Sequence, residues 1–204
     1  MPCNHKFIND LQLEYVDWKV KTLFIGTFNP EWNECKNNYS EWFYGRTQRN
    51  GFWCILPKVH KQNSMIKGNR DIWIEFCRKN EIAITDIIVK IDADVNNFEQ
   101  RETVCKFKDA DLLNYKVEIN NIVSILNRFP TITQICITRQ RKGLSAFWLN
   151  CFMATIQYIE QNPQRKIQIR YLRSPSRGAI KGVIGDFCDF IANKWINQGY
   201  QLNS

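Results

Sequence analysis

The chain has 204 residues, of which 28 are Lys or Arg and 20 are Asp or Glu, so its formal net charge is +8, and 44% of its residues are hydrophobic. This composition predicts a single domain spanning residues 1–204 and excludes disordered and collagen-like chains. No window approaches the roughly 18 uninterrupted apolar residues of a membrane span, and the N-terminus lacks the apolar core of a secretory signal. We therefore expect a cytoplasmic protein that does not enter membranes.

Four short apolar runs rich in β-branched residues have the length of buried strands. In chain order these runs cover residues 22–27, 82–89, 134–138 and 167–172. Amphipathic stretches of helix length lie between and after them, at 52–59, 72–80, 116–129, 144–161 and 181–197. The alternation predicts an α/β fold, a three-layer α/β/α sandwich around a four-stranded, mainly parallel sheet, because right-handed crossovers place helices on both faces. The polar stretch 91–114 is expected to form an insertion or a long surface loop.

The eight cysteines are widely scattered, at positions 3, 35, 54, 77, 105, 136, 151 and 188. A closed zinc or iron–sulfur site usually draws on a CxxC-like pair, and disulfide-dense folds are usually much shorter chains. The spacing therefore predicts reduced thiols, and we expect neither a metal nor another cofactor.

Positive charge is concentrated in residues 139–181, where nine basic residues face a single acid, Glu160. The nine are Arg139, Arg141, Lys142, Arg165, Lys166, Arg170, Arg173, Arg177 and Lys181. A surplus held in one fifth of the chain can build a positive face that attracts nucleic acid. The alternative is a solvated surface whose acids come from elsewhere in the fold.

The loop after the first strand, Ile25-Gly26-Thr27-Phe28-Asn29-Pro30, has the residues of a nucleobase pocket. Ligands of such folds bind beyond the carboxyl ends of the strands. Gly26 lets the backbone approach a ligand closely, Phe28 can offer a ring face, and the Asn29 amide can donate and accept hydrogen bonds. The alternative is an ordinary turn closed by Asn-Pro.

The loop after the last strand, Leu172-Arg173-Ser174-Pro175-Ser176-Arg177-Gly178-Ala179, precedes the final predicted helix. Small hydroxyl residues and exposed amides near a helix start can seat a phosphate, with Arg173 or Arg177 adding charge. A Ser-Pro-Ser turn that caps a helix is the alternative.

Together these segments resemble the uracil-DNA glycosylase superfamily, closest to its mismatch-specific and hypoxanthine-acting branches. IGTFNP at 25–30 is similar to the first motif of the superfamily, and Asn50-Gly51-Phe52-Trp53 resembles the Asn-x-Phe-Trp that opens the next helix. The run 82–90 is similar to the second strand of those branches, which a Thr-Asp pair ends. LRSPSRGA at 172–179 stands at the second active-site motif, the loop that intercalates beside a flipped nucleotide.

The resemblance implies a monofunctional DNA glycosylase that hydrolyses the N-glycosidic bond of uracil or another deaminated base in DNA, during base excision repair. In this interpretation Asn29 orients the attacking water, and Asn50 binds a base carbonyl or also positions water. The residues expected to bind the base are Gly26, Thr27, Phe28 and Tyr44. The residues expected to bind DNA are Arg173, Ser174, Pro175, Ser176 and Arg177. We expect a monomer whose partner is DNA with a damaged or mismatched base.

The chain departs from the most active, uracil-specific members, which carry Asp in the first motif and His in the second. Here the corresponding residues are Asn29 and Arg173, and the two histidines, His5 and His60, lie outside both motifs. This pattern fits the slower branches, or a catalytically silent nucleic-acid-binding protein with the same fold. A nucleotide-hydrolysing enzyme is disfavoured because the chain has no GxxxxGK[ST] run, and a cysteine nucleophile because no histidine motif accompanies it.

Overall fold

The computed structural model describes residues 1–204 except 36–39, 47–49, 107–110, 177–184 and 204. Its central sheet has four parallel strands in the order β3-β2-β6-β7. The strands are β2 (Thr22–Gly26), β3 (Ile82–Asp86), β6 (Gln134–Ile137) and β7 (Gln168–Tyr171). β2 lies between β3 and β6, and its last residue, Gly26, pairs with Asp86. The predicted four-stranded parallel sheet is confirmed.

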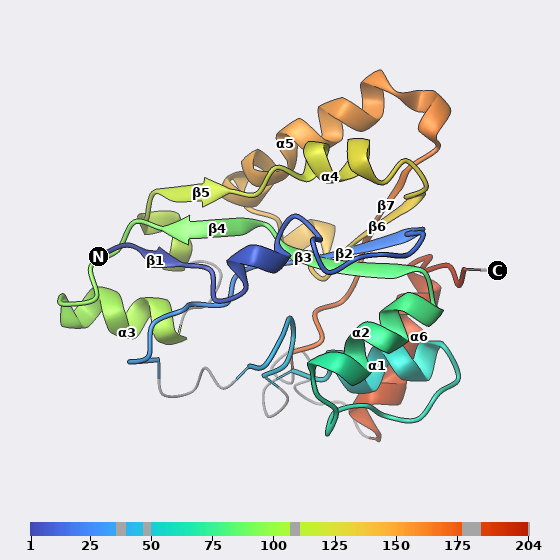
Figure 1. The fold of residues 1–204 in the computed structure, drawn as a ribbon, viewed down its shortest axis with the longest axis horizontal. Helices are drawn as coiled ribbons and strands as arrows, with labels where there is room; N and C mark the ends of the chain where they lie inside the picture. The colour runs from blue at the N-terminus through green and yellow to red at the C-terminus, as the bar shows by residue number, and fades with distance from the viewer. Residues whose placement is uncertain (36–39, 47–49, 107–110, 177–184, 204) are drawn as a thin grey trace.

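Helices cover both faces of this sheet, which gives three layers (Figure 1). One face carries α4 (Ile122–Arg128) and α5 (Ala146–Gln161). The other carries α1 (Phe52–Val59), α2 (Arg70–Lys79) and α6 (Phe187–Asn197). Successive residues of β2 point to opposite faces, so Leu23 and Ile25 join the core under α4 and α5, whereas Phe24 packs against α1 and α6. The α/β/α class is therefore as expected.

A second, antiparallel sheet was not predicted. It has the order β1-β4-β5, with β1 (Cys3–Asn4), β4 (Ile88–Ile91) and β5 (Val117–Ile119). The prediction of a single strand at 82–89 was wrong, because the chain leaves the parallel sheet after Asp86 and continues as β4. The helix predicted at 116–129 is also wrong in its first half. It is β5 followed by the shorter α4, whose start is set by the Asn121 side chain accepting a hydrogen bond from the Ser124 amide.

The stretch 91–114 contains a helix, α3 (Phe98–Lys106), which corrects the prediction of a loop. Asn97 accepts hydrogen bonds from the amides of Glu99 and Gln100 and so begins this helix. α6 begins at Phe187, where Asp186 caps it by accepting from the Asp189 amide, and the first residues of the helix predicted at 181–197, residues 181–184, lie outside the described part of the chain. Among the described residues, none of the helices has the length and apolar character to cross a membrane.

Four of the eight cysteines form disulfides, Cys35–Cys105 and Cys54–Cys188, so the prediction of reduced thiols was wrong for these residues. The pairs are 70 and 134 residues apart in the sequence, and the fold brings their Cα atoms to 4.8 and 5.9 Å. Close spacing along the chain, which the prediction used, carries no information about such long-range pairs. The other four cysteines are free and buried.

Candidate functional site

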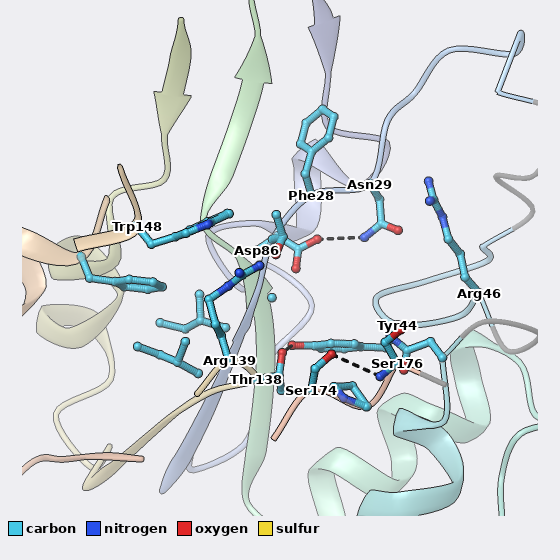
Figure 2. Close-up of a pocket in the computed structure, with 17 residues that line it drawn as sticks. Phe28, Asn29, Tyr44, Arg46, Asp86, Thr138, Arg139, Trp148, Ser174 and Ser176 are labelled. Carbon is cyan, nitrogen blue, oxygen red and sulfur yellow. Dashed lines mark hydrogen bonds between the residues drawn. The ribbon is translucent and has the colours of Figure 1, made fainter. Parts of the chain in front are cut away.

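A pocket of about 490 Å³ opens at the carboxyl ends of β2, β3 and β6, beside the loop that follows β7 (Figure 2). Its volume lies within the roughly 300–1,000 Å³ typical of small-molecule sites. Residues from the two predicted loops and from the segments between them line it: Ile25, Gly26, Thr27, Phe28, Asn29, Tyr44, Arg46, Asn50, Asp86, Ile137, Thr138, Arg139, Trp148, Phe152, Ser174, Pro175 and Ser176. The turn that carries Asn29 and the turn that carries Ser174 therefore border one pocket.

The loop after β7 is fastened to the segment that precedes α1. Asn50 and Ser176 form an isolated antiparallel bridge, and the Gly51 amide donates to the Pro175 carbonyl at 2.8 Å. Within the turn, the Ser176 amide donates to the Ser174 hydroxyl at 3.2 Å. These bonds hold both loops at the pocket, so Asn50, Ser174, Pro175 and Ser176 line it together.

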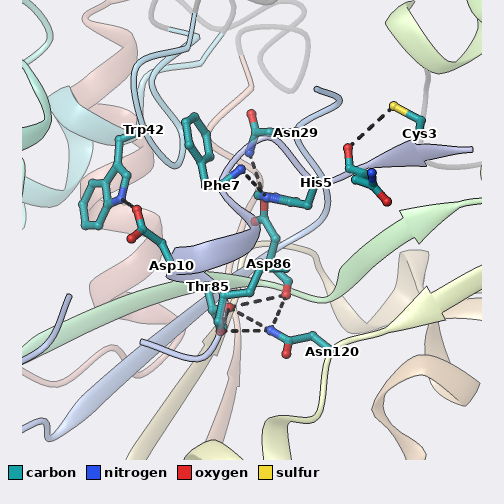
Figure 3. A network of polar contacts seen from close by, with 11 residues as sticks. Cys3, His5, Phe7, Asp10, Asn29, Trp42, Thr85, Asp86 and Asn120 are labelled. Atoms are coloured by element: carbon teal, nitrogen blue, oxygen red, sulfur yellow. Dashed lines mark hydrogen bonds and ion pairs between the residues drawn. The ribbon is translucent and has the colours of Figure 1, made fainter. Parts of the chain in front are cut away.

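A buried carboxylate, Asp86, lies at the centre of a polar network in the pocket wall (Figures 2 and 3). Its Oδ2 accepts a hydrogen bond from Asn29 Nδ2 at 2.8 Å and also lies 2.8 Å from His5 Nε2. Asp86 is 3% exposed and His5 is fully buried. Behind the carboxylate, Asn120 donates to the backbone carbonyl of Asp86 and to the Thr85 hydroxyl. The carboxylate is thus positioned by the side chains of His5 and Asn29.

The bond network fixes the tautomer of His5. The Phe7 amide donates to His5 Nδ1 at 3.0 Å, so Nδ1 is unprotonated and the proton of the neutral ring lies on Nε2, which donates to Asp86. The N-terminal segment brings His5 to the site because its amide bonds the Val89 carbonyl, and because His5 forms a bridge with Pro30. In the sequence His5 lies outside both motifs, whereas in the structure it lies against the first.

The structure gives a different reason for a glycine at position 26 from the one predicted. A Cβ atom at this position would lie 2.1 Å from Asp86 Oδ1 and 3.0 Å from the Tyr44 hydroxyl oxygen. The space above Gly26 is therefore occupied by the Asp86 carboxylate and the Tyr44 ring. A glycine is required for these two side chains to reach the pocket, whether or not a ligand also approaches the backbone.

The two aromatic residues expected to hold a base differ in their surroundings. Tyr44 stacks one ring face on Phe52, with centroids 3.9 Å apart, and its hydroxyl bonds the Thr138 hydroxyl at 3.0 Å. Burial raises the pKa of Tyr44 above its ordinary value, so the phenol stays neutral. Its backbone φ of 57° is unusual for a non-glycine residue and typical of constrained sites. Phe28 is 5% exposed and contacts His5 edge to face, so most of its ring belongs to the core.

Asn50 uses half of its amide group for the fold. Its Oδ1 accepts from the Phe52 amide at 2.8 Å, which satisfies a free N–H group at the start of α1. The remaining NH₂ group belongs to a side chain that lines the pocket. The predicted helix start at Phe52 is confirmed. The group of Asn50 that remains available to a ligand is a hydrogen-bond donor.

The basic residues of 139–181 that the structure describes do not gather at one place. Arg139 lines the pocket, 4.6 Å above the Trp148 ring, and burial lowers the pKa of its guanidinium. Arg173 does not line it, because its side chain lies over the Phe190 ring of α6. Arg165 donates to the carbonyls of Leu126 and Phe129 at the end of α4, which is a structural role. Arg177, the remaining predicted DNA contact, lies outside the described residues.

Several residues of this site were not predicted as site residues, among them His5 and Asp86, and also Arg46 and Arg139, which line the pocket. Asp86 had a signal, since it completes the Thr-Asp pair noted at the end of the second strand. His5 had none, because its position depends on pairing of the N-terminal segment with β4. In the ranges that the structure describes, no group of three or more His, Cys, Asp or Glu side chains is arranged to hold a metal ion.

Comparisons with known proteins agree with the architecture. No model of a known protein family matches the sequence, and no curated protein matches it. Among solved structures, the solution NMR structure of a "putative Uracil DNA glycosylase" from Methanosarcina acetivorans is similar, with a TM-score of 0.51 and 13% identity. The match covers 91% of this chain and 94% of that one. The chain therefore has a uracil-DNA-glycosylase-like α/β fold, and at this identity the likeness concerns the fold alone.

Proposed function

We propose that the protein is a monofunctional DNA glycosylase, which releases uracil or another deaminated base from DNA by hydrolysing the N-glycosidic bond. The observation that carries the proposal is the convergence of the Asn29 turn and the Ser174–Ser176 turn on one pocket, within a uracil-DNA-glycosylase-like fold. Such an enzyme must draw a base out of the duplex at a cost of a few kcal/mol, which is smallest for mismatched bases such as deaminated ones.

The residues around the pocket suit the parts of this reaction. Tyr44 and the backbone of Thr27 and Phe28 would contact the extruded base, and the NH₂ group of Asn50 would donate to a base carbonyl. Ser174 and Ser176 would bind the flanking phosphates, which fix the register of the DNA without reading its sequence. Arg46 and Arg139 also line the pocket. Their positive charge would attract the phosphate backbone of the bound DNA.

The test is release of bases from duplexes that contain uracil, hypoxanthine or xanthine, followed by cleavage of the resulting abasic sites with alkali. The wild type is expected to release at least one of these bases. Asn29→Ala is expected to lower the rate about a hundredfold or more while leaving DNA affinity nearly intact. Asn33→Ala, a change at an exposed asparagine outside this pocket, serves as the matched control and should keep the wild-type rate. Equal rates in wild type and Asn29→Ala would place the chemistry elsewhere.

A second candidate is a catalytically silent nucleic-acid-binding protein with the same fold. One feature favours it: the Asn29 amide, which the first candidate needs for chemistry, already bonds a buried carboxylate. Binding to DNA without release of any of the three bases would support this candidate and contradict the first.

A further inference from the structure

Asp86 is a carboxylate in an unusual setting for this basic protein. It lines the pocket, it is 3% exposed, and among the residues that the structure describes no Lys or Arg lies within ion-pair distance of it. Its two side-chain donors, Asn29 and the Nε2–H tautomer of His5, are neutral groups. Buried carboxylates are normally paired with a cation, because removing the charge from water is costly. Here the described residues supply no such cation, so the place beside the carboxylate is open to a cationic group that enters the pocket.

The two donors leave one oxygen of Asp86 for the pocket. Both bond Oδ2, whereas Oδ1 lies over Gly26 and has no hydrogen-bond donor in the described part of the chain. The side chain cannot rotate freely, because two bonds of 2.8 Å hold Oδ2 and the Tyr44 ring lies beside it above Gly26. The orientation of the carboxylate is therefore set before any ligand binds.

We propose that Asp86 is the catalytic carboxylate of this site, which β3 supplies in place of the acid that the first motif lacks, and that His5 and Asn29 position it. This inference rests on the proposed function. An extruded nucleotide in the pocket would place its sugar near the negative charge of Asp86. The charge would then stabilise the cation that develops on the sugar as the bond to the base breaks.

The C1′–N bond breaks and its electron pair leaves with the base. A water oxygen forms a bond to C1′, and the water gives one proton to Asp86 Oδ1. That proton then passes, through solvent, to the departed base nitrogen, which leaves a free base, a C1′ hydroxyl and an ionised Asp86. No metal or redox partner is needed.

The first measurement compares the affinity of the wild-type protein for two DNA duplexes that differ only at one abasic position. One carries a neutral tetrahydrofuran, and the other carries a pyrrolidine ring that is cationic at neutral pH. The protein has a net charge of +8, so general electrostatics disfavours the cation. We expect the cationic duplex to bind at least about tenfold more tightly, because a buried carboxylate attracts a nearby cation strongly. Equal affinities would overturn the proposal without any variant.

The second measurement repeats the comparison with Asp86→Asn, which keeps the shape of the side chain and removes its charge. The preference for the cationic duplex should fall to near one, and base release should fall about a hundredfold or more. Asp92→Asn, at an exposed aspartate just after β4, is the control and should change neither value. Because His5 acts through Asp86, His5→Leu should reduce the preference, whereas His5→Gln, which can still donate, should restore most of it.

The outcomes separate this inference from the proposed function. A cation preference that Asp86→Asn abolishes, without release of any base by the wild type, supports the placement of Asp86 and contradicts the glycosylase. If the wild type releases a base and the rate of Asp86→Asn lies within threefold of the wild-type rate, the glycosylase is supported and Asp86 takes no part in the chemistry.

Discussion

Substituting Gly26 by alanine tests the packing at the centre of the site, independently of any activity. The added Cβ would lie 2.1 Å from Asp86 Oδ1 and 3.0 Å from the Tyr44 hydroxyl oxygen. The first distance is more than about 1 Å shorter than a normal non-bonded contact. The carboxylate must move, and in moving it loses ideal geometry with both His5 and Asn29.

The expected cost combines overpacking with weakened hydrogen bonds to a charged group. Overpacking of a filled site costs about 1–3 kcal/mol, and hydrogen bonds to charged groups contribute about 1.5–3 kcal/mol each. Since the carboxylate can relax partly, we expect Gly26→Ala to lower the free energy of unfolding by about 2–4 kcal/mol. Urea denaturation followed by circular dichroism measures this change.

A double-mutant cycle identifies the clashing partner. If the clash is with the carboxylate, Gly26→Ala should cost at least about 1 kcal/mol less in an Asp86→Ala background than in the wild type. A cost of Gly26→Ala below about 0.5 kcal/mol, or an equal cost in both backgrounds, would refute the inferred packing of Asp86 above Gly26.

Three further predictions concern the scaffold. Burial lowers the pKa of His60 to about 4, and because the unfolded imidazole takes up its proton near pH 6.5, stability present at pH 7 is lost as the pH falls between these values. Urea denaturation at pH 7 and pH 5 should show a loss about 1–2 kcal/mol larger in the wild type than in His60→Gln; equal losses would contradict it. Asn50→Ala should lower the free energy of unfolding by about 1 kcal/mol, because the Phe52 amide loses its acceptor, whereas Asn50→Asp keeps it; equal stability of the two variants would argue against this role. Alkylation of the unfolded, unreduced protein should label four of the eight cysteines, as counted by mass spectrometry. Eight labels would rule out both disulfides, Cys35–Cys105 and Cys54–Cys188.

The sequence was most informative where local pattern and burial agree. β2, β3 and β6 are short apolar runs buried on both faces, so their composition alone identifies them. β7, at the edge of the sheet, is only partly buried. α1 begins at Phe52 as predicted, because its amphipathic pattern and its acceptor, Asn50, are neighbours in the chain. The approach of the two predicted loops followed from a general property of parallel sheets, whose carboxyl ends meet at one edge.

The rest depended on contacts between distant segments. β5 is a strand because it pairs with β4, although its own residues are mostly exposed and suited a helix equally well. Asp86 was visible only as the end of a strand, and nothing local indicated that its carboxylate would face the pocket. His5 reaches Asp86 across 81 positions of the chain, through pairing of the first strand.

The central claim is that this pocket receives a nucleotide extruded from DNA. The most direct test is a crystal structure of the protein with a duplex that carries the released base on a 2′-fluorinated, hydrolysis-resistant sugar. The account predicts that the base lies in the pocket beside Tyr44, with C1′ next to Asp86 and the flanking phosphates at Ser174 and Ser176. A base that remains stacked in the duplex, or one extruded onto another surface, would contradict it.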